Sequence, residues 1–245
     1  MQKTTVIHHS ADFDGIFCRE IARKFLPDAE LIGWDYGDPL IPFPSEGTVY
    51  VLDLSPECFA PLEVAARDWP RLIWIDHHKS AIEKFGAAIP GYRIDGVAAC
   101  RLAWQWFLAK GHTDEGRDAI AWDWRVLPFP QDFIDRKVSE PLAVRLAGEY
   151  DIWDKRDPRA ETFQFGLRAQ DLACLWELLL VPEQESNGQK DVGSFAVDGL
   201  LETGASLQRY QREVDAGVVK RAFEVKFEGL TFLALNTARC NSLTF

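Results

Sequence analysis

Residues 4–15, Thr-Thr-Val-Ile-His-His-Ser-Ala-Asp-Phe-Asp-Gly, decide the fold class of this chain. The apolar stretch at residues 4–8 predicts a short strand, which runs directly into polar and acidic residues. A helix follows, because apolar side chains then recur at helical spacing, at Ile16, Phe17, Ile21, Ala22 and Phe25. A strand, an acidic turn and a helix in this order form the first unit of an α/β fold.

Two further buried strands also end in acidic residues. Residues 48–53, Thr-Val-Tyr-Val-Leu-Asp, end at Asp53, and residues 71–76 run into Asp76-His77-His78. Residues 31–34 form another short strand, and near-continuous apolar strands that alternate with helices predict a parallel sheet covered on both faces. We therefore expect an α/β fold: a mainly parallel five-stranded sheet with helices on both faces, plus the start of a second small domain.

The remaining pattern predicts helices, loops and one hairpin. We expect helices at residues 56–67, 97–109, 139–150 with Ser139 as N-cap, most of 163–180, and 199–221. Residues 37–47 and 122–135 have the composition of loops. Residues 223–236 alternate around Glu228-Gly229, which is typical of a hairpin.

The hairpin sets the expected domain boundaries. A two-stranded hairpin is marginal alone, so we expect it to begin a second domain rather than to dock on the first as a lid. The predicted division is a first domain at residues 1–181, a linker and connecting helix at 182–222, and the start of an incomplete C-terminal domain at 223–245.

Composition and charge exclude several classes of protein. Hydrophobic residues make up 47% of the 245 residues, and no run approaches the roughly 18 apolar residues of a membrane span. The N-terminus turns polar too early for a signal peptide, and the five scattered cysteines predict a reduced, cytoplasmic protein. The net charge of −11 disfavours a grip on long duplex nucleic acid. A small anionic partner is compatible, since a metal ion supplies positive charge locally.

Aspartate and histidine side chains gather at the carboxyl ends of three predicted strands, where an open α/β sheet has its ligand crevice. They are His9, Asp12, Asp14, Asp53, Asp76, His77 and His78. This set contains no thiolate, which suits Mn²⁺ or Mg²⁺ better than structural zinc. So many carboxylates repel one another unless cations neutralise them, and two ions sharing a carboxylate would also activate a water for attack on phosphorus.

Each of these residues also has a purely structural interpretation. Asp12 could cap the following helix, with Gly15 easing the turn. Asp53 could be a polar strand end, and His9 a hydrogen-bonded histidine. The functional interpretation is favoured because three such clusters lie at three equivalent strand ends.

Four motifs occur in order along residues 4–240. They are His9-Ser-Ala-Asp12-Phe-Asp14-Gly15, Val51-Leu-Asp53-Leu-Ser55, Asp76-His77-His78 and Glu149-Tyr-Asp151-Ile-Trp153. In this order, on a parallel-sheet pattern, they resemble the DHH phosphoesterases. The sequence departs from that family in having two residues between His9 and Asp12, where one is commonest, and in lacking the Gly-Gly-Gly-His-like loop of the DHH-associated domain.

The resemblance implies a role for each motif residue. One divalent ion would be held by His9, Asp12 and Asp53, and a second by Asp14, Asp53, His77 and Asp151. His78 would face the substrate phosphate, and Asp76 would orient its neighbours, which makes these two the candidate catalytic residues. The family usually uses Mn²⁺, with Mg²⁺ as the alternative. His8 is an alternative to His9, and Asp154 to Asp151.

We therefore expect a metal-dependent phosphoesterase that hydrolyses short oligonucleotides or small nucleotides with a water activated by two metal ions. Arg168 and Arg239 are further candidates for phosphate contacts. An exopolyphosphatase, or a non-catalytic nucleotide-binding module on the same fold, is the alternative. The expected partner is a small anionic phosphate compound, with no long duplex and no membrane, and the oligomeric state stays open.

Overall fold

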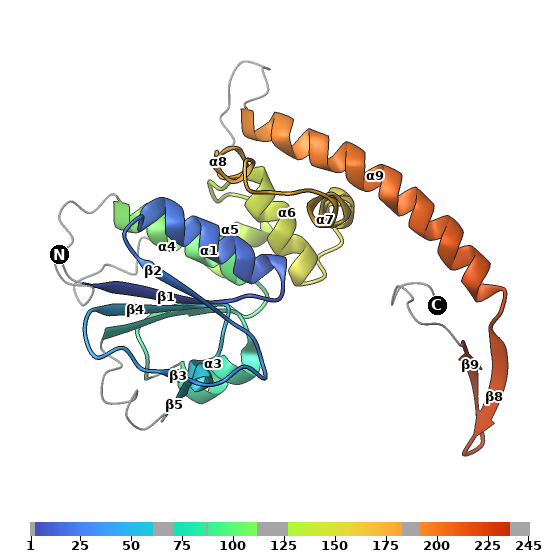
Figure 1. The fold of residues 1–245 in the computed structure, drawn as a ribbon, viewed down its shortest axis with the longest axis horizontal. Helices are drawn as coiled ribbons and strands as arrows, with labels where there is room; N and C mark the ends of the chain where they lie inside the picture. Colours follow the sequence, from blue (N-terminus) through green and yellow to red (C-terminus); the bar gives the residue numbers. More distant parts are fainter. Residues whose placement is uncertain (1–2, 61–70, 87, 112–126, 183–191, 236–245) are drawn as a thin grey trace.

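The computed structural model describes residues 3–60, 71–86, 88–111, 127–182 and 192–235. Its centre is a five-stranded sheet in which every neighbouring pair is parallel, in the order β2-β1-β4-β6-β7 (Figure 1). The strands are β1 (Thr4–His9), β2 (Glu30–Trp34), β4 (Thr48–Leu52), β6 (Leu72–Asp76) and β7 (Gly91–Arg93). This confirms the α/β fold and the five-stranded sheet. The sequence pattern located the first four strands and missed β7.

Helices cover both faces of the sheet. The helices α1 (Phe13–Phe25) and α4 (Ala99–Gly111) lie on one face, and α3 (Lys79–Phe85) lies on the other (Figure 1). Successive side chains of a strand point to opposite faces. Accordingly, Val6 joins the core under α1 and α4, whereas its neighbour Ile7 joins the core under α3. Both faces are apolar, which explains why these strands show no polar alternation.

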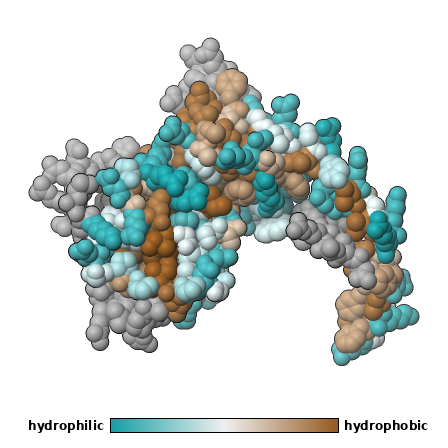
Figure 2. Space-filling view, viewed as in Figure 1, coloured by the Kyte–Doolittle hydropathy of each residue, from teal (hydrophilic) through white to brown (hydrophobic). Residues whose placement is uncertain are grey.

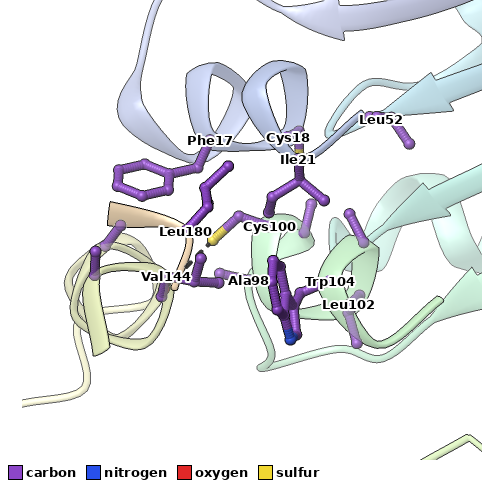
Figure 3. Packing of buried hydrophobic residues seen from close by; sticks show 14 of the residues in the cluster. Phe17, Cys18, Ile21, Leu52, Ala98, Cys100, Leu102, Trp104, Val144 and Leu180 are labelled. Atoms are coloured by element: carbon purple, nitrogen blue, oxygen red, sulfur yellow. Dashed lines mark hydrogen bonds between the residues drawn. The ribbon is translucent and has the colours of Figure 1, made fainter. Parts of the chain in front are cut away.

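A second helical layer extends the larger core. It comprises α5 (Pro130–Ile134), α6 (Leu142–Asp151), α7 (Arg159–Ala169) and α8 (Trp176–Leu179). Figure 3 shows Phe17 and Cys18 of α1 facing Cys100 of α4 and Val144 of α6. The Cys100 thiol also donates to the carbonyl of Val144, at 3.6 Å. This packing fixes the C-terminal end of α6 beside the N-terminal ends of α1 and α4.

The last described elements form an arm. The helix α9 (Val192–Val219) packs against α7 and leads to the hairpin of β8 (Phe223–Phe227) and β9 (Leu230–Ala234) (Figure 1). The predicted hairpin is thus confirmed. All its strand residues except Ala234 are exposed, and Figure 2 shows their apolar side chains at the end of the arm. The hairpin does not join the parallel sheet, and the domain division stays a prediction.

The helix predicted at residues 56–67 is wrong at its start. The chain forms a single 3₁₀ turn, η1 (Pro56–Cys58), and then the short strand β5 (Phe59–Ala60), which pairs with β3 (Ile41–Pro42). The extended conformation lets the Phe59 ring pack on Phe43, with their centroids 4.9 Å apart. This burial outweighs the helix signal of Pro56, and residues 61–70 lie outside the described ranges.

Two other predicted helix starts differ. Ser139 does not cap α6, which begins at Leu142 after Pro141, because a residue that precedes proline is disfavoured in helical conformation. The arm helix α9 begins at Val192, earlier than the predicted residue 199. The loop predicted at 122–135 is wrong over Pro130–Ile134, which form α5 because a proline suits the first helical position. Residues 122–126 of this loop and 183–191 of the predicted linker lie outside the described part of the chain. In that part, no helix has the length and apolarity to cross a membrane.

Candidate metal centre

The strand order reverses direction between β1 and β4, which makes this the switch point of the sheet. The chain leaves β1 toward α1 on one face, and it leaves β4 toward η1, whose Cys58 packs into the core of the other face. Connections that diverge at neighbouring strands open a crevice at the carboxyl edge of the sheet. His9 is the last residue of β1 and Asp53 directly follows β4, so both lie at this point.

The backbone is specialised at both strand ends. Asp53 is buried and has a φ of 58°, a left-handed conformation that non-glycine residues seldom adopt. After β1, α1 lies so close to the strand that a Cβ on Gly15 would sit 2.2 Å from the carbonyl oxygen of His9. Only glycine allows this approach, which brings the first turn of α1 next to His9.

His9, Asp12 and Asp53 form the first group of candidate ligands. Nδ1 of His9 lies 3.0 Å from Oδ2 of Asp12 and 3.6 Å from Oδ2 of Asp53. Asp12 also caps α1, since its Oδ1 accepts from the backbone N–H of Gly15 at 3.0 Å. The structural and functional interpretations of Asp12 are therefore compatible, with one oxygen for each.

Asp14, His77 and Asp151 form the second group. Nε2 of His77 lies 3.5 Å from Asp14, 3.3 Å from Asp151 and 3.4 Å from Oδ1 of Asp53. Asp14 is fixed by the N-terminal turn of α4, whose Ala99 and Cys100 N–H groups donate to its two oxygens at 2.8 and 2.7 Å. Asp53 thus presents Oδ2 to the first group and Oδ1 to the second.

His78 is held by Asp76. The Oδ1 atom of Asp76 lies 2.7 Å from Nδ1 of His78 and accepts from the backbone N–H groups of His77 and His78. Asp76 is fully buried, whereas the His78 side chain is 44% exposed. Asp76 therefore holds Nδ1 of a ring that is half-exposed.

Charge repulsion shapes the ionisation of the ligand-free site. Burial, reinforced by the neighbouring Asp53 carboxylate, raises the pKa of Asp14 to about 7. Burial and the charge of Asp14 raise the pKa of Asp151 to about 7 in the same way. Contacts with Asp12 and Asp53 raise the pKa of His9 to about 11. Burial opposes the protonation of His77, but Asp53 and Asp14 outweigh it and raise its pKa to about 10.

The residues present fit divalent cations. In the described part of the chain, buried Asp76 Oδ2 makes no hydrogen bond, an arrangement that normally costs stability, and His9 Nδ1 and Asp53 Oδ1 have only ion-pair contacts within the ligand groups. Donor atoms within each group lie within 4.8 Å of one another, close enough to share an ion. Carboxylate and imidazole donors without a thiolate suit Mn²⁺ or Mg²⁺.

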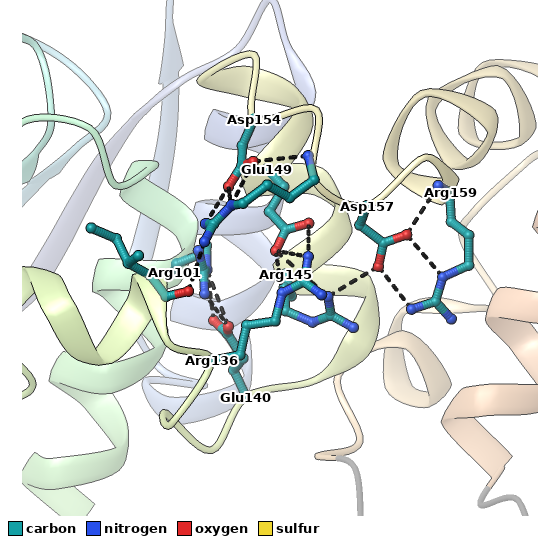
Figure 4. Close-up of polar contacts among 10 residues, drawn as sticks. Arg101, Arg136, Glu140, Arg145, Glu149, Asp154, Asp157 and Arg159 are labelled. Carbon is teal, nitrogen blue, oxygen red and sulfur yellow. Dashed lines mark hydrogen bonds and ion pairs between the residues drawn. The ribbon is translucent and has the colours of Figure 1, made fainter.

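An ion-pair network anchors the end of α6 that carries Asp151. Buried Glu149 pairs with Arg136 at 3.1 Å and with Arg145 at 3.5 Å, and Arg145 pairs with Asp157 (Figure 4). A buried pair, Arg101–Glu140, ties α4 to the segment before α6. Asp154, the alternative to Asp151, instead pairs with Arg156 on the surface.

Sequence reasoning missed Asp35. Its Oδ1 lies 3.1 Å from Nε2 of His9, so the two ring nitrogens of His9 face different carboxylates. Asp35 directly follows β2, and an acid at the carboxyl end of a fourth strand was the signal that could have found it. His8, the alternative to His9, is buried and its Nδ1 contacts the His9 carbonyl instead.

A cleft of about 270 Å³ opens beside the second group. Asp12, Asp14 and Asp151 line one part of it, and Tyr150, Gln164 and Arg168 another. Arg168 is exposed, with its guanidinium 5.7 Å from the centre of the Tyr150 ring. A predicted phosphate contact therefore lies at the mouth of the site, while Arg239 lies outside the described residues.

Comparisons with known proteins concern the fold. No model of a protein family matches the sequence, and no curated protein does. One similar solved structure is an uncharacterized protein from Helicobacter pylori G27, with 12% identity over 94% of this chain and 74% of that chain, and a TM-score of 0.47. Another is the DHH domain of a member of the s1p family of ribosomal proteins, with 13% identity over 96% of this chain and a TM-score of 0.48. This chain spans 63% of that second structure, and similarity at this level says nothing about the chemistry of the site.

Proposed function

We propose that this protein is a divalent-metal-dependent phosphoesterase, resembling the DHH family, that acts on short oligonucleotides or small nucleotides. One observation carries the proposal: two His/Asp groups from separate segments converge at the switch point of the sheet, and buried Asp53 lies between them. A metal-free binding protein would gain nothing from so many mutually repelling acids.

Metal ions would be held by His9, Asp12 and Asp53 and by Asp14, Asp53, His77 and Asp151. When bound, two divalent cations neutralise the carboxylates and promote in-line attack of water on phosphorus, and Mn²⁺ is the proposed metal. His9 is oriented by Asp35, and histidine ligands held in this way are typical of metal sites.

His78 and Arg168 are the proposed contacts to the substrate. Asp76 binds Nδ1 of His78 and, although burial opposes it, raises the pKa of His78 above its ordinary value. The imidazolium can then donate from Nε2 to a phosphate oxygen, and Arg168, which lines the cleft beside Asp14 and Asp151, is the proposed contact to a second phosphate oxygen. A cleft of about 270 Å³ suits a small ligand rather than a duplex.

Hydrolysis assays test the proposal. Chelator-treated protein should be inactive, and added Mn²⁺ should restore cleavage of a dinucleotide. Preferential release of phosphate from polyphosphate would indicate an exopolyphosphatase instead. Nucleotide binding without turnover of any ester or anhydride in the presence of Mn²⁺ or Mg²⁺ would indicate a binding module and contradict the proposed enzyme.

A further inference from the structure

Trp153, two residues beyond Asp151, has a backbone conformation that usually belongs to glycine. Its φ is 56°, and it ends α6 in a Schellman turn, in which Trp153 N–H donates to the Tyr150 carbonyl and Asp154 N–H donates to that of Glu149. A bulky side chain is a rare outlier in the left-handed region. Burial does not compensate, since Trp153 is 53% exposed.

The exposed indole belongs to an aromatic pair. The Trp153 and Tyr150 rings lie 6.0 Å apart with an interplanar angle of 27°, so they are nearly parallel. Nζ of Lys155 lies 4.4 Å from the centre of the Trp153 ring. The ring face that the Lys155 side chain reaches is also accessible to a flat, polarisable group of a ligand.

Two clefts share one member of this pair as a lining residue. Tyr150 lines the cleft at Asp12, Asp14 and Asp151, and it also lines a second cleft of about 330 Å³. Trp153, Lys155, Thr162 and Arg212 are among the other residues that line the second cleft. A ligand in the cleft beside the metal centre therefore has Tyr150 in its wall, and the neighbouring cleft adds the Trp153 ring and the cationic Lys155 and Arg212.

Resting on the proposed function, we propose that Trp153 and Tyr150 form a stacking platform for a nucleobase of the substrate. Base stacking on an aromatic ring contributes about 5–150-fold in affinity, because every base has a π face. An exposed cation–π contact contributes only about 2–5-fold, so a base displaces Lys155 from the ring. The freed ammonium and Arg212 then face the sugar-phosphate backbone, which makes the substrate class a nucleotide or short oligonucleotide rather than polyphosphate.

The test compares substrates that differ only in their bases. kcat/KM is measured with Mn²⁺ for an adenine dinucleotide and for an abasic dinucleotide with the same backbone. Trp153→Gly should lower kcat/KM about 5–150-fold for the adenine substrate, mainly through KM, and leave the abasic substrate within about twofold. Trp153→Phe should retain most of the activity, since it keeps an aromatic ring.

Folding does not confound this design. Glycine favours the backbone conformation of residue 153, so Trp153→Gly should keep or raise the melting temperature. Phe195→Ala removes an exposed aromatic ring of α9 that lines neither cleft, so it should leave kcat/KM unchanged for both substrates. Equal losses of Trp153→Gly on both substrates, or no loss on either, would overturn the platform.

A binding measurement separates this proposal from the proposed function. If the wild type hydrolyses nothing, titration calorimetry with AMP and ribose 5-phosphate still reports on the platform. A Trp153→Gly protein that binds AMP more weakly, with ribose 5-phosphate unchanged, supports the platform without the enzyme. Turnover by the wild type with no preference for the adenine substrate supports the enzyme and overturns the platform.

Discussion

Asp53 is the residue on which both ligand groups depend. One of its oxygens faces His9 and the other faces His77, and a strained backbone holds the side chain in place. Strain of this kind persists where the surrounding structure overrides it, and it clusters at functional sites. Asp53→Asn is the sharpest probe, because asparagine tolerates the left-handed conformation and keeps the shape of the side chain.

We expect Asp53→Asn to abolish metal-dependent activity while the metal-free protein stays folded. The amide would remove a carboxylate from each ligand group. It would also remove both a charge that repels Asp14 and one that attracts His9 and His77, so the two effects on the metal-free fold oppose each other. Calorimetry in chelator measures the stability of the variant, and a dinucleotide assay in Mn²⁺ measures its activity. Near-normal turnover of the folded variant would contradict a shared ligand.

Asp35 acts on the metal centre through His9. Asp35→Asn should keep the fold, because the Asp35 side chain is half-exposed, but it should weaken metal affinity by about 10–100-fold, as loss of a carboxylate behind a histidine ligand typically does. Titration of apo-protein with Mn²⁺ measures this. Asp28→Asn, which changes an exposed acid on the other side of β2, is the control and should leave the affinity unchanged. Equal effects of the two substitutions on metal affinity would contradict a role for Asp35 in the metal centre.

At the scale of elements, α7 and α9 touch through their backbones. A Cβ on Gly166 would lie 2.1 Å from the carbonyl oxygen of Leu200, and one on Gly204 would lie 2.0 Å from that of Thr162. Two glycines on facing helices therefore allow α9 to pack closely on α7. Larger residues at these positions would prevent this approach.

We expect Gly204→Ala to push α9 off α7 and to destabilise the protein by about 1–3 kcal/mol, the usual cost of overpacking. Gly217→Ala is the matched control on the same helix, because a Cβ there meets nothing within 4 Å. The control should stabilise α9 by up to about 1 kcal/mol, since alanine favours helix. Urea unfolding of both variants measures the difference. A similar stability for both would mean that the helices do not require this contact.

At the scale of the whole molecule, the site makes the metal-free fold sensitive to pH. Asp14 and Asp151 have pKa values raised to about 7, so their protonated forms favour the folded state, and that contribution is lost as the pH rises from about 4 to 7. The raised pKa values of His9 and His77 contribute fully below about pH 6.5, and this is lost toward pH 10 to 11. Both effects have the same sign.

The melting temperature of chelator-treated protein should therefore fall as the pH rises from 5 to 9. Added Mn²⁺ should raise it at each pH, and the increment should grow with pH, because metal ligands bind in their deprotonated forms. Differential scanning calorimetry at pH 5, 6.5 and 8 measures both trends. A metal-free melting temperature that rises with pH, or no response to metal, would contradict this account of the site.

The sequence by itself determined the α/β class, four strands of the sheet and the acids and histidines at its carboxyl edge. This was possible because strands buried on both faces appear in the sequence as apolar runs, and because parallel strands bring their carboxyl ends to one edge of the sheet. The positions of His9, Asp53 and His77 follow from those two facts alone.

Only the tertiary structure decided the rest. Phe59 extends as a strand where local signals favoured a helix, because its burial against Phe43 is a contact between distant segments. Asp35 meets His9 through the pairing of β1 with β2, and Asp151 meets His77 because α6 packs beside α1 and α4. Trp153 is exposed because it lies in the turn that ends α6. Its backbone there has a glycine-like conformation, which no neighbouring residue type predicts. Contacts between segments far apart in the chain produce no periodic pattern in the local sequence, so they can be identified only in the folded structure.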